Sequence, residues 1–230
     1  MQTLSKPDPR LLSALPYLTR GGKCIDVGTD HAYLPIHLIR EGIVSHAMAC
    51  DINEGPLLSA KEHITAAGLN DRINTYLTDG LQGLSEYDAD DIMIFGMGGE
   101  LIIKILKEAP WVRDGRIGLI LQPMSRVSLL RRYLIENGFS ILGESLSKSG
   151  KIYQTIYARY TGETCQYSEE ELLLGRLNIQ NNPPLFAEFV AHECAVCQKV
   201  LLGKEQSDRA DAAAERRMLQ ILTERLEKLK

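Results

Sequence analysis

The sequence lacks the features of several large classes of protein. None of its apolar runs approaches the roughly 18 residues that span a membrane. Its start, MQTLSKPDPR, holds no apolar segment of signal-peptide length, so we expect a cytoplasmic protein with no membrane association. Its five cysteines have no framework spacing, which favours free thiols. With 230 residues, 44% of them hydrophobic, the chain is long enough for one large domain with an appendage.

The chain has little net charge, −4, but its charges are unevenly distributed. Residues 100–160 carry 10 lysines and arginines against 5 acids, whereas the segments on either side are acidic. This basic block is consistent with a phosphate-binding face and equally with a solvated surface.

Residues 23–160 alternate short apolar runs with amphipathic stretches, a pattern typical of a parallel sheet covered by helices. We predict strands over residues 23–27, 47–52, 73–77, 91–95, 118–122, 139–147 and 153–159. We predict helices over residues 34–41, 55–67, 100–107 and 127–137. The polar loop SKSGK joins the last two strands as a hairpin, so we expect an α/β fold with seven strands, one of them antiparallel.

The composition changes after residue 160, which predicts a boundary between residues 1–160 and a helical extension over residues 161–230. The segment TGETCQYS has the composition of a linker, and two apolar-striped helices follow it. The first predicted stripe comprises Leu185, Phe189, Val196 and Val200 beside Phe186, Val190, Cys197 and Leu201. In the second helix, leucines 219, 222, 226 and 229 step by 3, 4 and 3, which predicts a short coiled-coil-like hairpin.

The turn after the first strand, in CIDVGTDHAY, contains a single glycine, Gly28. A dinucleotide site needs G-x-G-x-x-G to hold a pyrophosphate, so an NAD-dependent dehydrogenase is disfavoured. An amino-acid tail fits better, because Asp26 or Asp30 could accept from its ammonium group and helix-start amides could bind its carboxylate. These features match S-adenosylmethionine.

Acids also follow the next two predicted strands. Asp51 can accept hydrogen bonds from two ribose hydroxyls, and Asp79 can accept one from an adenine amine. Each acid alone is as consistent with a helix cap or a surface loop. Three acids after successive strands predict a methyl-donor site, because open α/β sheets bind ligands at that edge.

The fourth predicted strand ends in IFGMGGEL and lacks the Asn/Asp-Pro-Pro-aromatic motif that exocyclic amine methylation often uses. A nucleophile with a localised lone pair, such as a ring nitrogen, would not need that motif. The alternative is a glycine-rich turn that serves packing only.

Six motifs occur in order along the chain: GTDHAYLP, EGP, DGL, GMGGELI, LQP and KIYQ. Together they resemble the bacterial tRNA (adenine-N1)-methyltransferases that modify position 22 in the D-arm, over nearly the whole chain. The resemblance implies a Rossmann-like class I fold, S-adenosylmethionine as methyl donor and tRNA as substrate. Two departures are Met124, where the family often has Asn, and the prolines near Arg10.

The resemblance also implies site residues at matching positions. Besides Asp26, the donor site would comprise Gly28, Thr29, Asp30, His31, Tyr33, Asp51, Ile52, Asn53, Asp79, Gly80, Gly96 and Met97. The substrate pocket would comprise Gly98, Gly99, Gln122 and Pro123. We assign no catalytic base, because a ring nitrogen has no proton to lose, and Asp30 is the candidate for a supporting charge.

Candidate tRNA contacts come from the basic block and from the C-terminal hairpin. The block supplies Lys104, Lys107, Arg126, Arg131, Arg132, Lys148 and Lys151, although adjacent Arg131 and Arg132 cannot both point the same way. The hairpin supplies Lys199, Lys204, Arg209, Arg216 and Arg217, but a hairpin that only packs or dimerises is equally open. We predict no metal, because His192, Cys194 and Cys197 are too few for a structural zinc.

Two other functions remain open from the sequence. A methyltransferase of a small molecule or protein would share the donor site but would not need the basic block. A non-catalytic RNA-binding or scaffold protein would have no reason to retain the three acids. Of the oligomeric states, a monomer is favoured.

Overall fold

A computed structural model describes residues 8–205 and 212–229. The chain divides into two compact units, Met1–Gln166 and Tyr167–Lys230. Residues 161–166 belong to the first unit, since the N–H groups of Thr161 and Gly162 donate to the Gly138 carbonyl. The division therefore falls later along the chain than residue 160.

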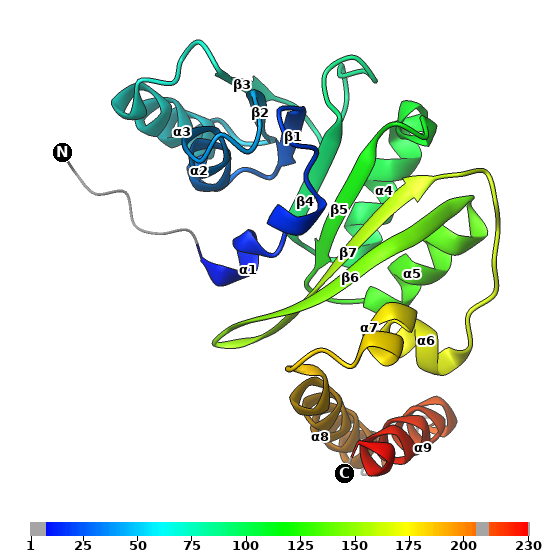
Figure 1. Ribbon diagram of the computed structural model, residues 1–230. Helices are drawn as coiled ribbons and strands as arrows, with labels where there is room; N and C mark the ends of the chain where they lie inside the picture. The colour runs from blue at the N-terminus through cyan, green and yellow to red at the C-terminus, as the bar shows by residue number, and fades with distance from the viewer. Residues whose placement is uncertain (1–7, 206–211, 230) are drawn as a thin grey trace. The chain divides into compact units, whose positions relative to one another are not determined.

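The first unit is built on a seven-stranded sheet in the order β3-β2-β1-β4-β5-β7-β6 (Figure 1). The strands are β1 (Lys23–Val27), β2 (His46–Asp51), β3 (Ile73–Leu77), β4 (Asp91–Met97), β5 (Gly118–Pro123), β6 (Phe139–Ser149) and β7 (Lys151–Tyr160). β1 to β5 pair in parallel, whereas β7 is antiparallel to both of its neighbours. The predicted sheet with one antiparallel strand is confirmed.

Helices cover both faces of this sheet, with α2 and α3 on one side and α4 and α5 on the other (Figure 1). The α-helices are α1 (Pro9–Leu12), α2 (Tyr33–Arg40), α3 (Glu54–Ala67), α4 (Gly99–Glu108) and α5 (Val127–Glu136). Two short 3-10 turns are η1 (Leu15–Tyr17) and η2 (Pro110–Arg113). All four predicted helices are present, while α1 and the two 3-10 turns were not predicted.

The core of the first unit follows from the alternation of side chains along each strand. On one face Ala47, Met93 and Ile120 pack with Leu38 of α2 and Ile64 of α3 in a single buried cluster. The neighbouring positions of β4 and β5 are buried too, because the opposite face is also covered there. Strands buried on both faces give the continuous apolar runs of the sequence.

The strand order places a switch point at the centre of the sheet. From β1 the chain builds outward through β2 and β3, and β4 then returns to the other side of β1. Ligands of open α/β sheets bind at the carboxyl ends of the strands at such a point.

The second unit consists of helices: α6 (Glu169–Leu174), α7 (Arg176–Asn181), α8 (Phe186–Glu205) and α9 (Ala213–Lys228). α8 and α9 pack against each other as the predicted hairpin. The predicted stripe of α8 was wrong in part, since Val196 and Val200 are exposed and Cys194 is buried instead. The buried positions keep the three- and four-residue spacing of one helix face: Phe186, Phe189, Val190, Cys194 and Cys197. After Val190 the predicted stripe passed over Cys194, which is why it included Val196 and Val200.

Burial of Cys194 and Cys197 confirms their interpretation as core residues, and all five cysteines are free thiols. Across the described ranges, no group of three or more His, Cys, Asp or Glu side chains has an arrangement suited to a metal ion. Among the same residues, no helix combines the length and the apolar character needed to cross a membrane.

Candidate functional site

The turn after β1 has an unusual backbone. Gly28 has a φ of +76°. The backbone N–H groups of Gly28 and Thr29 both donate to the Cys50 carbonyl of β2, each at 2.8 Å. His31 and Ala32 follow with φ of 58° and 56°, both left-handed, directly before α2 begins. Left-handed non-glycine residues cost roughly 1–3 kcal/mol each, and such strain clusters at functional sites.

Asp26 lies at the end of β1 and is buried beneath this turn. Its Oδ2 accepts a hydrogen bond of 2.7 Å from Thr29 Oγ1. Burial raises the pKa of Asp26 to about 6; the charges of Asp30 and Asp51 also raise it, and the Thr29 bond opposes them.

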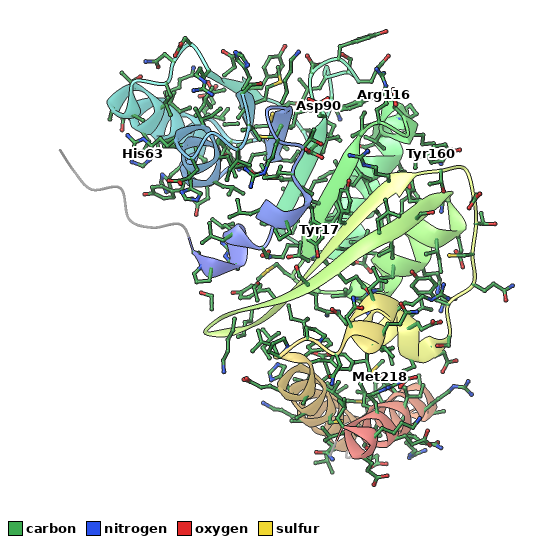
Figure 2. All side chains as sticks on the ribbon, in the orientation of Figure 1. Tyr17, His63, Asp90, Arg116, Tyr160 and Met218 are labelled. Atoms are coloured by element: carbon green, nitrogen blue, oxygen red, sulfur yellow. The ribbon has the colours of Figure 1, made fainter. Side chains whose placement is uncertain are left out.

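Three rings line the outer side of the turn. The rings of His31, Tyr33 and His63 have centroids 5.2–5.5 Å apart. His63, which projects from α3 (Figure 2), places Nδ1 3.0 Å from the His31 carbonyl. Because a carbonyl only accepts, His63 Nδ1 is the donor. His31 Nε2 lies 3.2 Å from Asp30 Oδ1, while His31 Nδ1 is buried with no partner among the described atoms.

The acids after β2 and β3 lie at the same edge of the sheet. Asp51 Oδ1 accepts from the Asn53 backbone N–H at 2.8 Å, and Oδ2 has no hydrogen-bond partner among the described residues. Ile52, beside it, is 60% exposed, an apolar surface next to a carboxylate. Asp79 Oδ2 lies 3.7 Å from Lys104 Nζ of α4, so this carboxylate faces a cation.

The glycines after β4 allow close contacts between three turns. A Cβ on Gly28 would lie 2.5 Å from Met97 Cε, so the turns after β1 and β4 touch. A Cβ on Gly99 would lie 2.6 Å from the Arg126 carbonyl oxygen, and the Gly99 N–H donates to the Ser125 carbonyl at 2.9 Å. The predicted donor residues after β1 and β4 are thus brought together with the turn after β5.

Gln122 was predicted to line the substrate pocket, and the structure places it away from the open surface. Its side chain is fully buried, and Nε2 donates to the Arg10 carbonyl at 2.9 Å and to Thr155 Oγ1 at 3.1 Å. Pro123 is buried as well. Gln122 therefore joins β5 to α1 and β7, and does not face an open surface.

Arg131 was predicted to contact tRNA, and its position excludes this. Its side chain is fully buried, with Nε 2.7 Å from Glu144 Oε1 and Nη2 2.8 Å from Gln154 Oε1. The remaining cations of the basic block are exposed: Lys104, Lys107, Arg126, Arg132, Lys148 and Lys151.

The predicted cations of the C-terminal hairpin are mostly ion-paired within the second unit. Lys204 lies 2.7 Å from Glu215, and Arg216 lies 3.0 Å from Glu205. Arg217 pairs with Glu169. Two members remain: Lys199 is exposed, and Arg209 lies outside the described residues.

Three residues that were not among the predicted site residues lie at the site, although the resemblance had pointed to Arg10 and the motif KIYQ contains Tyr153. Arg10 Nη1 is 3.8 Å from where a Cβ on Gly96 would be, and Tyr153 lies beneath its guanidinium. The third is His63. The pair Asp8-Pro9 was a usable signal for Arg10, because Asp is a preferred N-cap and Pro a preferred first residue of a helix.

Comparison with known proteins gives the family. Residues 8–156 match the family described as "Methyltransferase domain". The chain is 31% identical to the tRNA (adenine(22)-N(1))-methyltransferase of Bacillus subtilis (strain 168), over 98% of this chain and 96% of that protein. The chain belongs to this methyltransferase family. The resemblance drawn from the six motifs is confirmed.

Solved structures of this family share the fold over both units. The m1A22 tRNA methyltransferase TrmK of B. subtilis has a TM-score of 0.78 at 30% identity, over 97% of each chain. Streptococcus pneumoniae Sp1610, solved in complex with S-adenosyl-L-methionine, has a TM-score of 0.82 at 30% identity. That comparison covers 94% of this chain and 98% of Sp1610.

Proposed function

We propose that this protein transfers a methyl group from S-adenosylmethionine to N1 of adenine 22 in the D-arm of tRNA. The observation that carries the proposal is 31% identity over 98% of the chain to the B. subtilis enzyme of that name. Its support within this chain is the edge of the sheet where Gly28, Asp51 and Asp79 meet.

The residues at this edge fit the methyl donor. The left-handed turn after Gly28 and the buried, unpaired His31 Nδ1 suit the methionine part. Asp51 offers a carboxylate oxygen to the ribose hydroxyls, and Ile52 offers apolar surface to the adenine ring. When bound, S-adenosylmethionine supplies an electrophilic methyl group on a sulfonium. Gly96 and Gly98 carry no side chain that would block the approach of a base.

The reaction needs little proton chemistry. The N1 lone pair of adenine lies in the ring plane and is unprotonated near neutral pH, so no group has to remove a proton before attack. Holding the base in line with the methyl group can supply roughly 7–11 kcal/mol of the barrier reduction. The exposed carboxylate of Asp30 is the candidate to stabilise the positive charge that appears on the base.

N1 lies on the Watson–Crick edge of adenine, so a paired base hides it. The enzyme must therefore open or flip the base, or act where the pairing is non-standard. The rest of the tRNA would be held through backbone and shape contacts. The exposed cations of the basic block, without Arg131, are the candidates for these contacts.

The decisive experiment incubates the protein with radiolabelled S-adenosylmethionine and unmodified tRNA, followed by digestion and identification of the nucleoside. We expect 1-methyladenosine, and none from a tRNA with guanine at position 22. Label in a protein or small molecule, with none in tRNA, would identify the other kind of methyltransferase. Absence of transfer despite donor binding would contradict the proposal.

The donor site is tested separately with Asp51→Ala. Loss of hydrogen bonds to a charged group costs about 1.5–3 kcal/mol, which corresponds to a roughly 10- to 100-fold rise in the Kd for the donor. Asp71→Ala, an exposed acid after α3, is the matched control and should leave the Kd unchanged. Equal effects of the two variants in calorimetric titration would remove Asp51 from the site.

A further inference from the structure

The N-terminal helix α1 brings a cation to the edge of the sheet. Asp8 caps this helix by accepting from the Arg10 N–H at 2.9 Å, and Pro9 occupies its first position. The Arg10 carbonyl in turn accepts from the buried Gln122 Nε2 at 2.9 Å and from Ser13 Oγ at 2.6 Å. The backbone at Arg10 is therefore fixed to β5.

The segment that follows is anchored to β7 as well. Ser13 Oγ lies 2.6 Å from Thr155 Oγ1. The Tyr17 ring stacks on Tyr157 with centroids 5.1 Å apart. These contacts involve backbone atoms and other side chains, so the Arg10 guanidinium is not needed to hold α1 in place.

The guanidinium itself lies beside Gly96, near the carboxyl end of β4. Arg10 Nη1 is 3.8 Å from where a Cβ on Gly96 would be, and apart from Gly96 and its two chain neighbours no other described residue comes within 4 Å of that point. The next residue, Met97, reaches the donor turn at Gly28. The cation thus adjoins the place where, on the proposed function, the methyl group meets the base.

The β6–β7 hairpin provides the surface on which this cation rests. β5 pairs with β7 only through Leu119–Leu121, opposite Ile156–Ala158. Because β7 is antiparallel, Tyr153 and Lys151 lie beyond the carboxyl end of β5, and Figure 1 shows the hairpin extending past the neighbouring strands. The Arg10 guanidinium is 5.7 Å from the Tyr153 ring centroid, and Lys151 Nζ is 5.2 Å from it.

Two cations around one ring attract an anion. Among the described residues, Arg10 pairs with one acid, Asp8, with Nε 3.5 Å from Oδ2, and Lys151 pairs with none. N1 methylation makes the base itself cationic, so a guanidinium against the base would oppose the reaction. A phosphate of the adjoining backbone is the group that fits, since a guanidinium binds phosphate through a planar pair of donors.

We propose that Arg10 binds a phosphate next to the adenosine that is methylated, and that Tyr153 positions Arg10 through its ring. This inference rests on the proposed function, because it assumes a tRNA nucleotide at the edge of the sheet. Gln122 is a second positioning residue, since it fixes the Arg10 backbone. Its burial thus has a role other than the substrate contact predicted for it.

The test compares Arg10→Ala and Arg10→Lys with Arg40→Ala, an exposed cation at the end of α2 that matches the charge change. For Arg10→Ala we expect a KM for tRNA raised tenfold or more, with an unchanged Kd for the donor. The slope of log K for tRNA binding against log salt concentration should become shallower by about 0.7–1, which is the change expected when one phosphate contact is lost. Arg10→Lys should fall between, because an ammonium retains charge without the planar donor pair.

A substrate with an uncharged linkage tests the assignment directly. A tRNA with a methylphosphonate on the 5′ or the 3′ side of adenine 22 removes one phosphate charge at a time. At one of the two positions, the substitution should raise the wild-type KM but leave that of Arg10→Ala nearly unchanged. Additive losses at both positions would overturn the inference.

Tyr153 is tested by Tyr153→Phe and Tyr153→Leu. Tyr153→Phe keeps the ring and should have the wild-type KM for tRNA, whereas Tyr153→Leu should have a higher KM. In both variants kcat should change less than KM. Equal effects of the two variants would contradict a role for the ring. If the wild-type protein methylates no tRNA, the proposed function fails and this inference with it. If the wild type is active and Arg10→Ala matches Arg40→Ala, only the inference fails.

Discussion

The buried ion pair between Arg131 and Glu144 gives the sharpest prediction about stability. Both side chains are fully buried, the Nε–Oε1 distance is 2.7 Å, and Arg131 Nη2 also donates to Gln154. Arg131→Ala would leave a carboxylate buried without its partner, which costs about 3–5 kcal/mol. The neighbouring Arg132 is exposed and its nitrogen lies 3.9 Å from Glu136, a pair that contributes about 0.3–0.5 kcal/mol. Adjacent arginines should therefore differ about tenfold in their effect.

The assay is urea denaturation followed by tryptophan fluorescence. The chain has one tryptophan, Trp111 in η2, so the signal reports the first unit. We expect Arg131→Ala to lower the free energy of unfolding by at least about 3 kcal/mol, and Arg132→Ala by less than about 0.5 kcal/mol. A loss below about 1 kcal/mol for Arg131→Ala would refute the reasoning.

A double variant separates the loss of the pair from the loss of packing. Arg131→Met together with Glu144→Leu removes both charges and retains most of the apolar volume. Replacement of a buried pair in this way is often neutral. The double variant should therefore be more stable than Arg131→Ala, although Gln154 loses a donor.

Three further predictions concern the donor turn and the basic block. Gly28→Ala should weaken donor binding at least tenfold by calorimetry, whereas Gly42→Ala, equally left-handed but with open space around it, should alter only stability. Because the folded-state pKa of Asp26 is raised, the stability it contributes is present below about pH 4 and is lost as pH rises through about 6. Asp26→Asn should thus stabilise the fold by up to about 3 kcal/mol at pH 7.5, with the gain vanishing towards pH 4 in urea titrations. Lys148→Ala with Lys151→Ala should weaken tRNA binding and reduce its salt dependence without altering donor affinity, and unchanged tRNA affinity would exclude this face.

Most elements of the sheet could be predicted because their sequence signal is local. Strands buried on both faces are continuous apolar runs, and the glycines and acids that end them are visible in the sequence. Of the helices that were missed, two had recognisable caps in the sequence. Asp8 with Pro9 begins α1, and Ser168 with Glu171 forms a capping box that begins α6. The prolines near Arg10 were interpreted as a departure from the family, although one of them begins a helix.

The site could be predicted at the level of backbone positions and not at the level of side-chain direction. Gln122 stands at the end of a strand, as a ligand residue would, but its orientation depends on Arg10 and Thr155, which are distant in sequence. Likewise, nothing near Arg131 indicates that Glu144 of β6 lies opposite it. Such pairings require the register of the sheet, which short-range patterns do not contain.

The central pairing of the sheet also governs the order in which the protein can form during synthesis. Cys24 of β1 pairs with Asp91 of β4, 67 residues later, whereas β2 and β3 follow β1 directly. At about 5–20 residues per second, the edge of β1 that β4 will cover is open for several seconds on the ribosome. An apolar strand with an open edge can pair with another chain. During the interval before β4 emerges, this edge of β1 is therefore exposed to pairing with other chains.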